Sequence, residues 1–291
     1  MTRPPWRRER REHFPGMPAW GLATSRLELE AFQVSRQEEV TRDWAWGGAD
    51  GSGVRVCVVD TGVEGGHPLV GALARSLVVV SGDDGRPMLA DCDPVDPAGH
   101  GTACASVIRS VAPGVSLTSV RVLTDGRTGT GAALLAGLRW AVEADFDLVN
   151  LSLSTTRNEF RAALHELADL AYFRRCLIVA SAHNMPVVSF PWAFSSVISV
   201  ASHDEPDPLT YYYNPAPPAE FYARGVKVPV AWPGGRRIHS TGNSFAAPHI
   251  TGVCALILSK HTWMTPFQLK SALYLTSRNV APDHGGTNVP V

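Results

Sequence analysis

Three segments of the sequence combine a residue type capable of acid–base or nucleophilic chemistry with backbone signals for exposure. Asp60 ends an apolar run and is followed by Thr61-Gly62, and His100 lies between two glycines. Ser244 stands at the start of an apolar stretch. A carboxylate that orients a general base, the base itself and a nucleophile would together perform acyl transfer. Each residue alone has a structural alternative: a turn or cap for Asp60, a packing role for His100 and an N-cap for Ser244.

The order of the three residues along the chain is a more specific signal for a catalytic triad than any of the residues alone. Asp, then His, then Ser is the order of subtilisin-type triads, and it differs from the orders in chymotrypsin and the α/β-hydrolases. The residues around each of the three positions also agree with a subtilisin-type triad. VVDTG at residues 58–62, GHGT at residues 99–102 and GNSFAAPH at residues 242–249 resemble the three motifs of the subtilisin-like serine peptidases, the subtilase family or peptidase family S8. Matching stretches extend from about Gly51 to Thr276.

The resemblance implies further site residues that the letters alone would not single out. VNLSLS at residues 149–154 resembles the family's edge strand, whose backbone pairs with an extended substrate. ASAHN at residues 180–184 resembles the segment that carries the oxyanion asparagine, which implies that the Asn184 amide and the Ser244 N–H bind the oxyanion. The substrate-binding residues implied in this way are Leu151, Ser152, Leu153, Ser154, Ala182, His183 and Asn243.

Three positions depart from the family pattern. Asn243 stands where the family usually has threonine, and we expect its amide to donate a hydrogen bond near the oxyanion and to alter the rate. His183 and Ser154 stand where glycines are usual in the walls of the primary specificity pocket. Added side chains should narrow that pocket, so we expect glycine or alanine before the scissile bond, and fast cleavage after Phe or Leu would contradict this.

We expect no cofactor and no metal ion. The family often has a calcium-binding loop that interrupts the helix after the catalytic histidine, but residues 103–110 run directly into Val111-Ala-Pro-Gly114, so that site is expected to be deleted. An acidic stretch precedes His100 and lacks the spacing of an EF-hand loop. We expect it to be a solvated loop, although its charge could instead favour basic substrate residues. Its acidic residues are Asp83, Asp84, Asp91, Asp93 and Asp96.

The elements that must position these residues alternate between β-rich and helical patterns, which predicts an α/β fold with a parallel sheet. Strands are expected at residues 54–59, 117–123, 148–153, 176–180 and 197–200, and helices at 102–110, 132–144 and 245–259. Pro248 is expected in the first turn of the last helix, where proline is tolerated. The resemblance implies a subtilisin-like three-layer fold with about seven strands. We expect an Arg-rich N-terminal arm at residues 1–40 and a peptidase domain at residues 41–291.

Composition limits the partners and the compartment. The formal net charge of −1 provides no field that favours nucleic acid or an acidic membrane, and we find no run of membrane-spanning length. Cys57, Cys104, Cys176 and Cys254 lie in apolar runs and are expected to be buried thiols, which favours a reducing compartment. No apolar signal-peptide stretch follows the arginines of residues 1–16. We therefore expect a cytoplasmic protein.

The expected function is a narrow-specificity serine endopeptidase that processes a precursor peptide or protein bound in extended conformation. An accessory maturation partner would be compatible with this role. Two alternatives remain at this point. One is a broad degradative peptidase, which would hydrolyse casein. The other is a catalytically silent module that grips a peptide along residues 151–154.

Overall fold

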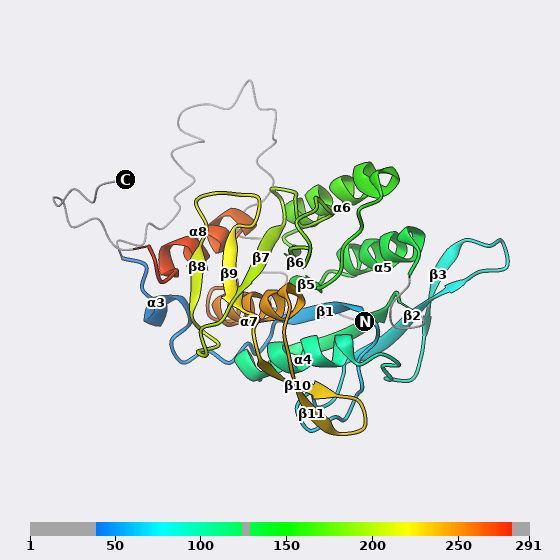
Figure 1. Ribbon diagram of the computed structural model, residues 1–291, viewed down its shortest axis with the longest axis horizontal. Coiled ribbons are helices and arrows are strands. Elements are labelled where there is room, and N and C mark those ends of the chain that lie inside the picture. Colours follow the sequence, from blue (N-terminus) through cyan, green and yellow to red (C-terminus); the bar gives the residue numbers. More distant parts are fainter. Residues whose placement is uncertain (1–38, 124–128, 281–291) are drawn as a thin grey trace.

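A large twisted sheet forms the middle of the molecule in the computed structural model, which describes residues 39–123 and 129–280 (Figure 1). The sheet has nine strands. The seven inner strands run parallel, and the two edge strands, β3 and β8, pair antiparallel with their neighbours. The resemblance implied about seven strands, which matches the parallel part. Across the sheet the strands are β3 (Pro87–Asp91), β2 (Arg75–Ser81), β4 (Ser116–Arg121), β1 (Arg55–Asp60), β5 (Leu148–Leu151), β6 (Leu177–Ser181), β7 (Ile198–His203), β9 (Phe221–Arg224) and β8 (Tyr211–Tyr213).

Helices cover both faces of this sheet, so the predicted three-layer α/β fold is confirmed. One face packs against α3 (Arg42–Trp46), α4 (His100–Val111), α7 (Asn243–Lys260) and α8 (Pro266–Thr276), and the other against α5 (Gly131–Glu143) and α6 (Arg161–Phe173). The short 3-10 helix η1 (Asn158–Phe160) precedes α6, and a separate hairpin consists of β10 (Val228–Trp232) and β11 (Arg236–Ser240). Figure 1 shows α4 and α7 side by side below α5 and α6.

Local sequence explains the central elements. In β1 every residue after Arg55 is buried, as expected for a parallel strand with helices on both faces. Most residues of α7 are also buried around its whole circumference, which is typical of a helix in the core rather than on the surface. Thr130 caps α5 by accepting from the Ala133 N–H, and Thr265 caps α8 in a capping box with Gln268.

Most predicted elements are present, with shifted ends, and several were not predicted. The sequence patterns missed two of the parallel strands, β2 and β9, both edge strands and the β10–β11 hairpin, and they also missed α3, η1, α6 and α8. The position expected for Pro248 is wrong, because α7 begins at Asn243 and the proline lies in its second turn. The N–H that a proline lacks would have bonded to the carbonyl of Ser244, so this carbonyl is open to other donors.

The acidic stretch before His100 is not simply a solvated loop. It includes β3, where Asp91 pairs with Arg75 at 2.7 Å across the β2–β3 hairpin, and Asp84 lies 3.6 Å from Arg86. Asp96 is buried. These contacts leave Asp83 and Asp93 as the members of the stretch for which a role toward basic substrate residues stays a prediction.

The expected N-terminal arm lies outside the described residues apart from its last two positions, so the boundary at residue 40 stays a prediction. The same is true of the end of the expected domain at residue 291. Within the described ranges, no helix combines the length and the apolar character needed to cross a membrane.

Candidate active site

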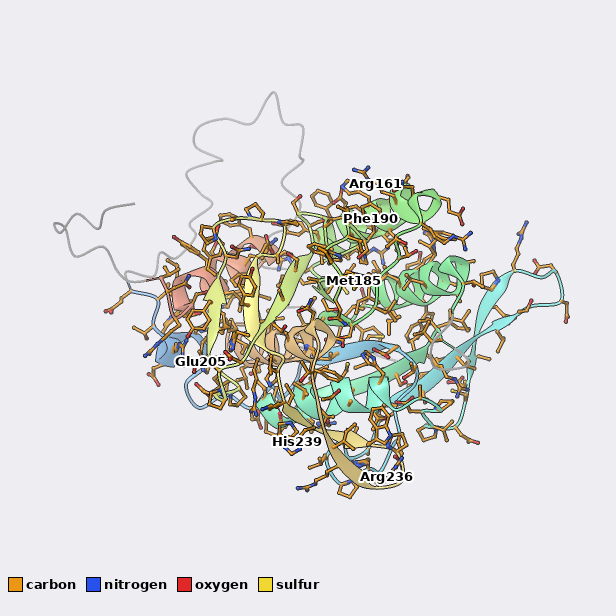
Figure 2. All side chains as sticks on the ribbon, in the orientation of Figure 1. Arg161, Met185, Phe190, Glu205, Arg236 and His239 are labelled. Atoms are coloured by element: carbon orange, nitrogen blue, oxygen red, sulfur yellow. The ribbon has the colours of Figure 1, made fainter. Side chains whose placement is uncertain are left out.

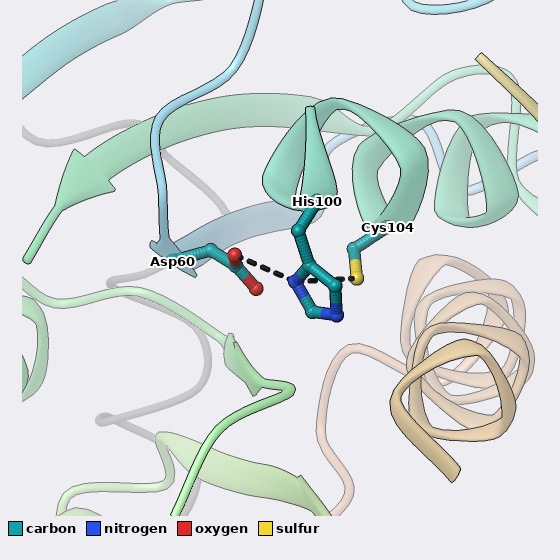
Figure 3. A group of neighbouring side chains, drawn as sticks. All are labelled: Asp60, His100 and Cys104. Atoms are coloured by element: carbon teal, nitrogen blue, oxygen red, sulfur yellow. Dashed lines mark hydrogen bonds and ion pairs between the residues drawn. The ribbon is translucent and has the colours of Figure 1, made fainter. Parts of the chain in front are cut away.

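Asp60 and His100 meet at the carboxyl edge of the sheet. Asp60 is the last residue of β1, and His100 is the first residue of α4. His100 Nδ1 lies 2.8 Å from Asp60 Oδ1, and the same oxygen accepts the Thr61 N–H at 2.8 Å. The carboxylate is buried, whereas 30% of the histidine side chain is exposed. In Figure 3 the second ring nitrogen of His100 points away from Asp60, so Nε2 is available for a reacting group.

Glycines on both sides of His100 permit this close approach, as the sequence suggested. Gly99 has a φ of 89°, a left-handed conformation that glycine adopts without strain. A side chain at Gly101 would collide with the carbonyl oxygen of Gly62, just beyond the end of β1. The first turn of α4 can therefore contact the end of β1 only with glycine at position 101.

The side chain of Asp96 joins the two sides of this junction between β1 and α4. Its Oδ1 accepts from the Thr61 hydroxyl at 2.8 Å and from the Gly99 N–H at 2.8 Å. Its Oδ2 accepts from both the N–H and the hydroxyl of Thr102, at 2.8 and 2.7 Å. The carboxylate thus joins the turn after Asp60 to the start of α4. Nothing in the sequence separates Asp96 from its acidic neighbours except its position four residues before His100.

The neighbours of His100 determine how it titrates. Burial alone would lower the pKa of His100, but the charge of Asp60 and its hydrogen bond, together with the neighbouring Cys104, raise this pKa well above its usual value. Cys104, one turn later in α4, has its Sγ 4.0 Å from His100 Nδ1. Burial raises the pKa of the Cys104 thiol, so the thiol is neutral near pH 7.

Ser244 lies in the first turn of α7, beside this junction. The N-cap of α7 is Gly242, so Ser244 lies inside the helix and the N-cap alternative is wrong. The Ser244 carbonyl, which has no helical partner because of Pro248, accepts from the Ser152 hydroxyl at 2.9 Å and from Cys104 Sγ at 3.4 Å. The ring of the next residue, Phe245, lies 5.6 Å from that of His100. The starts of α4 and α7 are therefore adjacent.

Asn184 lies beside Ser244. The Asn184 Oδ1 accepts the Asn243 N–H at 3.0 Å, which holds the amide in place and leaves its Nδ2 group to donate to another acceptor. A Cβ atom placed on Gly242 would lie 3.4 Å from Ser244 Oγ, 3.5 Å from Asn184 Nδ2 and 3.6 Å from Asn184 Oδ1. The Ser244 hydroxyl and the Asn184 amide therefore both lie next to the position that Gly242 leaves without a side chain, and an oxyanion beside it could accept from Nδ2.

Asn243 does not donate toward this space, which corrects our expectation. Its Oδ1 accepts from the N–H and the hydroxyl of Ser202, at 2.9 and 2.8 Å, and its Nδ2 donates to the His183 carbonyl at 3.1 Å. The side chain therefore ties the start of α7 to β7 and to the segment that carries Asn184. Its role is to position this segment.

The segment at residues 151–154 also differs from the expectation. It does not belong to an edge strand, because β5 lies between β1 and β6. Leu151 is fully buried and is paired with Ala180, so only the backbone beyond it extends past the sheet. Ser152, Leu153 and Ser154 follow β5, and Ala182 and His183 follow the neighbouring strand β6. The His183 ring accepts the Met185 N–H at 3.0 Å and is thereby held within its own loop.

Asp60, His100 and Cys104 also form a group whose ligand atoms all lie within 4.8 Å of one another, close enough to hold a metal ion (Figure 3). From the sequence Cys104 was expected to be a buried thiol and not a residue of the site. An ion there would need the thiol deprotonated and would occupy the ring nitrogen that faces Asp60. A metal ion and a working acid–base pair are therefore alternatives at this site.

Comparisons with known proteins agree on the family. The model of the subtilase family matches residues 51–289. Subtilisin DY of Bacillus licheniformis is 30% identical over 248 residues, which are 80% of this chain and 86% of the relative. Thermitase of Thermoactinomyces vulgaris is 28% identical over 236 residues, 77% and 81% of the two chains. A crystal structure of a cold adapted subtilisin-like serine proteinase is 27% identical and covers 82% of this chain and 88% of its own, with a TM-score of 0.64.

Proposed function

The chain belongs to the subtilase family of serine-type peptidases, and from this premise we propose that Asp60, His100 and Ser244 are its catalytic triad. The observation that carries the proposal is the 2.8 Å bond between the buried carboxylate of Asp60 and His100 Nδ1. The start of α7 lies beside it, because the Phe245 ring is 5.6 Å from that of His100. This bond holds the imidazole in the tautomer whose Nε2 can accept a proton.

In the proposed reaction Ser244 Oγ attacks the carbonyl carbon of the peptide bond, and His100 Nε2 takes the hydroxyl proton. Asp60 stabilises the resulting imidazolium. The negative oxygen of the tetrahedral intermediate occupies the space bordered by Asn184 Nδ2 and accepts from the Ser244 N–H, one of the first N–H groups of α7.

His100 then gives its proton to the amine leaving group, and the carbon–nitrogen bond breaks to leave an acyl-enzyme on Ser244. Water hydrolyses this ester by the same route, with His100 again as the base. The residue before the scissile bond lies between residues 152–154 and residues 182–183, with the substrate extended along them.

The proposal extends to a processing role in the cytoplasm. Cys57, Cys104 and Cys254 are buried free thiols, as the sequence predicted, and Cys92 is a free thiol that is partly exposed. Unpaired cysteines of this kind are typical of reducing compartments. A peptidase in such a compartment meets many proteins it must not degrade, so we propose one precursor peptide or protein as its substrate.

A fluorophosphonate tests the triad directly. We expect one adduct on Ser244 by mass spectrometry in the wild type and none in Ser244→Ala or His100→Ala, with circular dichroism showing that both variants fold. An adduct that persists in folded Ser244→Ala would refute the assignment of the nucleophile.

Casein tests the narrow specificity separately. An enzyme that labels fully with the fluorophosphonate and leaves casein intact supports a processing role. Extensive hydrolysis of casein by the same preparation would support a degradative peptidase instead.

A further inference from the structure

A cavity of about 480 Å³ opens where the end of α6, the start of α8 and the turn before β7 meet. Because this turn precedes β7, the cavity lies at the amino-terminal edge of the parallel strands. Asp60 ends β1 at the opposite, carboxyl-terminal edge. The cavity is therefore separated from the candidate active site by the length of the strands.

Aromatic side chains form walls of this cavity. Phe173, the last residue of α6, and Phe267, in the first turn of α8, both line it and are 82% and 70% exposed. Tyr172 lines it as well, and its ring lies 6.0 Å from that of Phe173 at an angle of 86°. Two of the walls are thus nearly perpendicular. The face of an aromatic ring carries partial negative charge and attracts a cation within about 6 Å.

The protein covers other aromatic rings with its own arginines. The guanidinium of Arg161, at the start of α6, lies 5.3 Å from the centre of the Phe190 ring, and Figure 2 shows the two residues side by side. Within residues 39–123 and 129–280, no arginine or lysine lies over the ring of Phe173 or Phe267 in this way. The faces of these two rings are therefore open to a cation from outside the described part of the chain.

One cation already lines the cavity, but its charge is balanced. Lys270 of α8 has its Nζ 2.7 Å from Glu220 Oε1, and it donates to the carbonyls of Ser195 and Val197 at 2.8 and 3.2 Å. These three contacts use the three N–H groups of the ammonium. Lys270 therefore contributes its hydrocarbon stem to the wall and keeps no donor for a ligand.

Asp169, one turn before Phe173 in α6, supplies a negative charge to the cavity. Its side chain is 45% exposed, and its ionic contact in the described part of the chain is the His165 ring, 3.8 Å away, which is charged only when protonated. The guanidinium of arginine and the ammonium of lysine pair with carboxylates and also bind to the faces of aromatic rings. Charge and ring geometry therefore favour the same class of ligand.

We propose that this cavity binds an arginine or lysine side chain of a partner protein, with the cation against the rings of Phe173 and Phe267 and paired with Asp169. Binding covers two phenylalanine side chains that are otherwise in contact with water, which is favourable in itself. The proposal goes beyond the proposed function and does not depend on the triad, because none of these residues belongs to it. The residues beside a scissile bond lie at the other edge of the sheet, so the bound segment is not the cleaved one.

Short blocked peptides test the site in the full chain. Ac-Gly-Arg-Gly-NH₂ carries the cation, Ac-Gly-citrulline-Gly-NH₂ has nearly the same shape without the charge, and Ac-Gly-Leu-Gly-NH₂ is apolar. Binding is measured by chemical-shift changes of the backbone amides in ¹⁵N-labelled Ser244→Ala protein, so that no peptide is hydrolysed. We expect the arginine peptide to shift amides around the cavity and to bind about fivefold more tightly than either of the other two.

Substitutions in the cavity separate the contributions of the rings and the charge. Phe173→Leu combined with Phe267→Leu keeps apolar side chains but removes both ring faces, and it should weaken binding of the arginine peptide about fivefold. Asp169→Asn keeps the size of the side chain and should weaken binding about two- to fivefold. Glu143→Gln, which removes an exposed carboxylate from α5, is the matched control and should leave the affinity unchanged. Circular dichroism checks that each variant is folded.

The outcomes distinguish a partner's basic side chain from other occupants. An arginine peptide that shifts no amide around the cavity, or that binds no better than the citrulline peptide, would overturn the proposal. Tightest binding of the leucine peptide would make the cavity an apolar site instead. The chain's own arginines in residues 1–16 are another source of the cation. Replacing them with glutamine should leave the affinity unchanged, and a rise in affinity would assign the cavity to that segment rather than to a partner.

Discussion

The buried carboxylate of Asp60 accepts hydrogen bonds from Thr61 N–H and from His100 through one oxygen. This arrangement holds the ring in place and, despite burial, raises the pKa of His100. Because the neutral imidazole is the base, activity should rise with pH as His100 loses its proton, and the raised pKa moves this rise to higher pH.

Asp60→Asn removes the charge that raises the pKa of His100. We expect the acidic limb of the pH–rate profile of fluorophosphonate labelling to shift to lower pH, and the rate on its plateau to fall by about 10⁴. The conservative amide keeps the size of the side chain, so the shift reports charge rather than packing. A limb at the same pH in both proteins would contradict the role of Asp60.

Asn184→Ala removes the amide that borders the space next to Ser244. In a subtilisin, removal of one such donor lowers kcat by about 10²–10³, so we expect a loss of about 2.7–4 kcal/mol in transition-state stabilisation. The measurement is kcat on any peptide that the wild type cleaves. Activity within tenfold of wild type would refute the oxyanion role.

At the scale of elements, the junction between β1 and α4 depends on groups that do not touch the substrate. Asp96 joins the turn after Asp60 to the first turn of α4, and Gly101 lets the two backbones approach. Changes here should act on the position of His100 rather than on its chemistry.

Asp96→Asn replaces an oxygen that accepts from Thr102 with an amide that cannot accept. We expect the free energy of unfolding to fall by about 1–3 kcal/mol, the cost of a buried group left unsatisfied. Labelling by fluorophosphonate should slow in the protein that remains folded. Asp93→Asn, at an exposed position of the same stretch, is the matched control and should change neither quantity.

Gly101→Ala tests the close approach of α4. The added methyl group meets the carbonyl oxygen of Gly62, so α4 must shift away from β1. We expect the rate of Ser244 labelling to fall, and the loss expressed as an activation free energy should exceed the loss in the free energy of unfolding. In the control Gly137→Ala, in α5, the methyl group meets the side chain of Val122, and stability should fall without a selective loss of labelling. Equal effects in the two variants would argue against a positioning role for Gly101.

At the scale of the molecule, the candidate site lies at a topological switch point of the sheet, where the strand order reverses. From β1 the chain adds β4 on one side and β5 on the other, so the carboxyl ends of these neighbours surround Asp60. Sites in open α/β sheets form at such switch points. The helices α4 and α7 on one face then bring His100 and Ser244 to the same edge.

Burial of the thiols is also a property of the whole fold. We expect iodoacetamide to modify Cys92 in the native protein, whereas Cys57, Cys104 and Cys254 react only after unfolding in urea, because they are buried and burial raises the pKa of all three thiols. Peptide mapping by mass spectrometry distinguishes the four. Rapid modification of Cys104 in the native state would show that the core beside His100 is open to solvent.

Local sequence signals indicated the family, the α/β class and five of the seven parallel strands, and they singled out Asp60, His100 and Ser244 as candidates. These signals are short-range: an apolar run before Asp60, glycines around His100 and a serine entering an apolar helix. The strand of residues 54–59 and the helix from residue 245 were predicted within two residues of their observed ends, because periodicity and glycine act locally.

Tertiary structure alone decided which side chains meet. Asp96 is one of five acidic residues in its stretch, and it is buried where it accepts hydrogen bonds from Thr61 and Thr102. Ser189 reaches Ser154 across 35 residues of chain, and Asn243 reaches Ser202 across 41. Such contacts depend on how β5, β6, β7 and α7 are placed in the sheet and its layers, which residue periodicity does not encode. The sequence thus determined the chemistry that the site can perform, and the fold decided the contacts that shape the site.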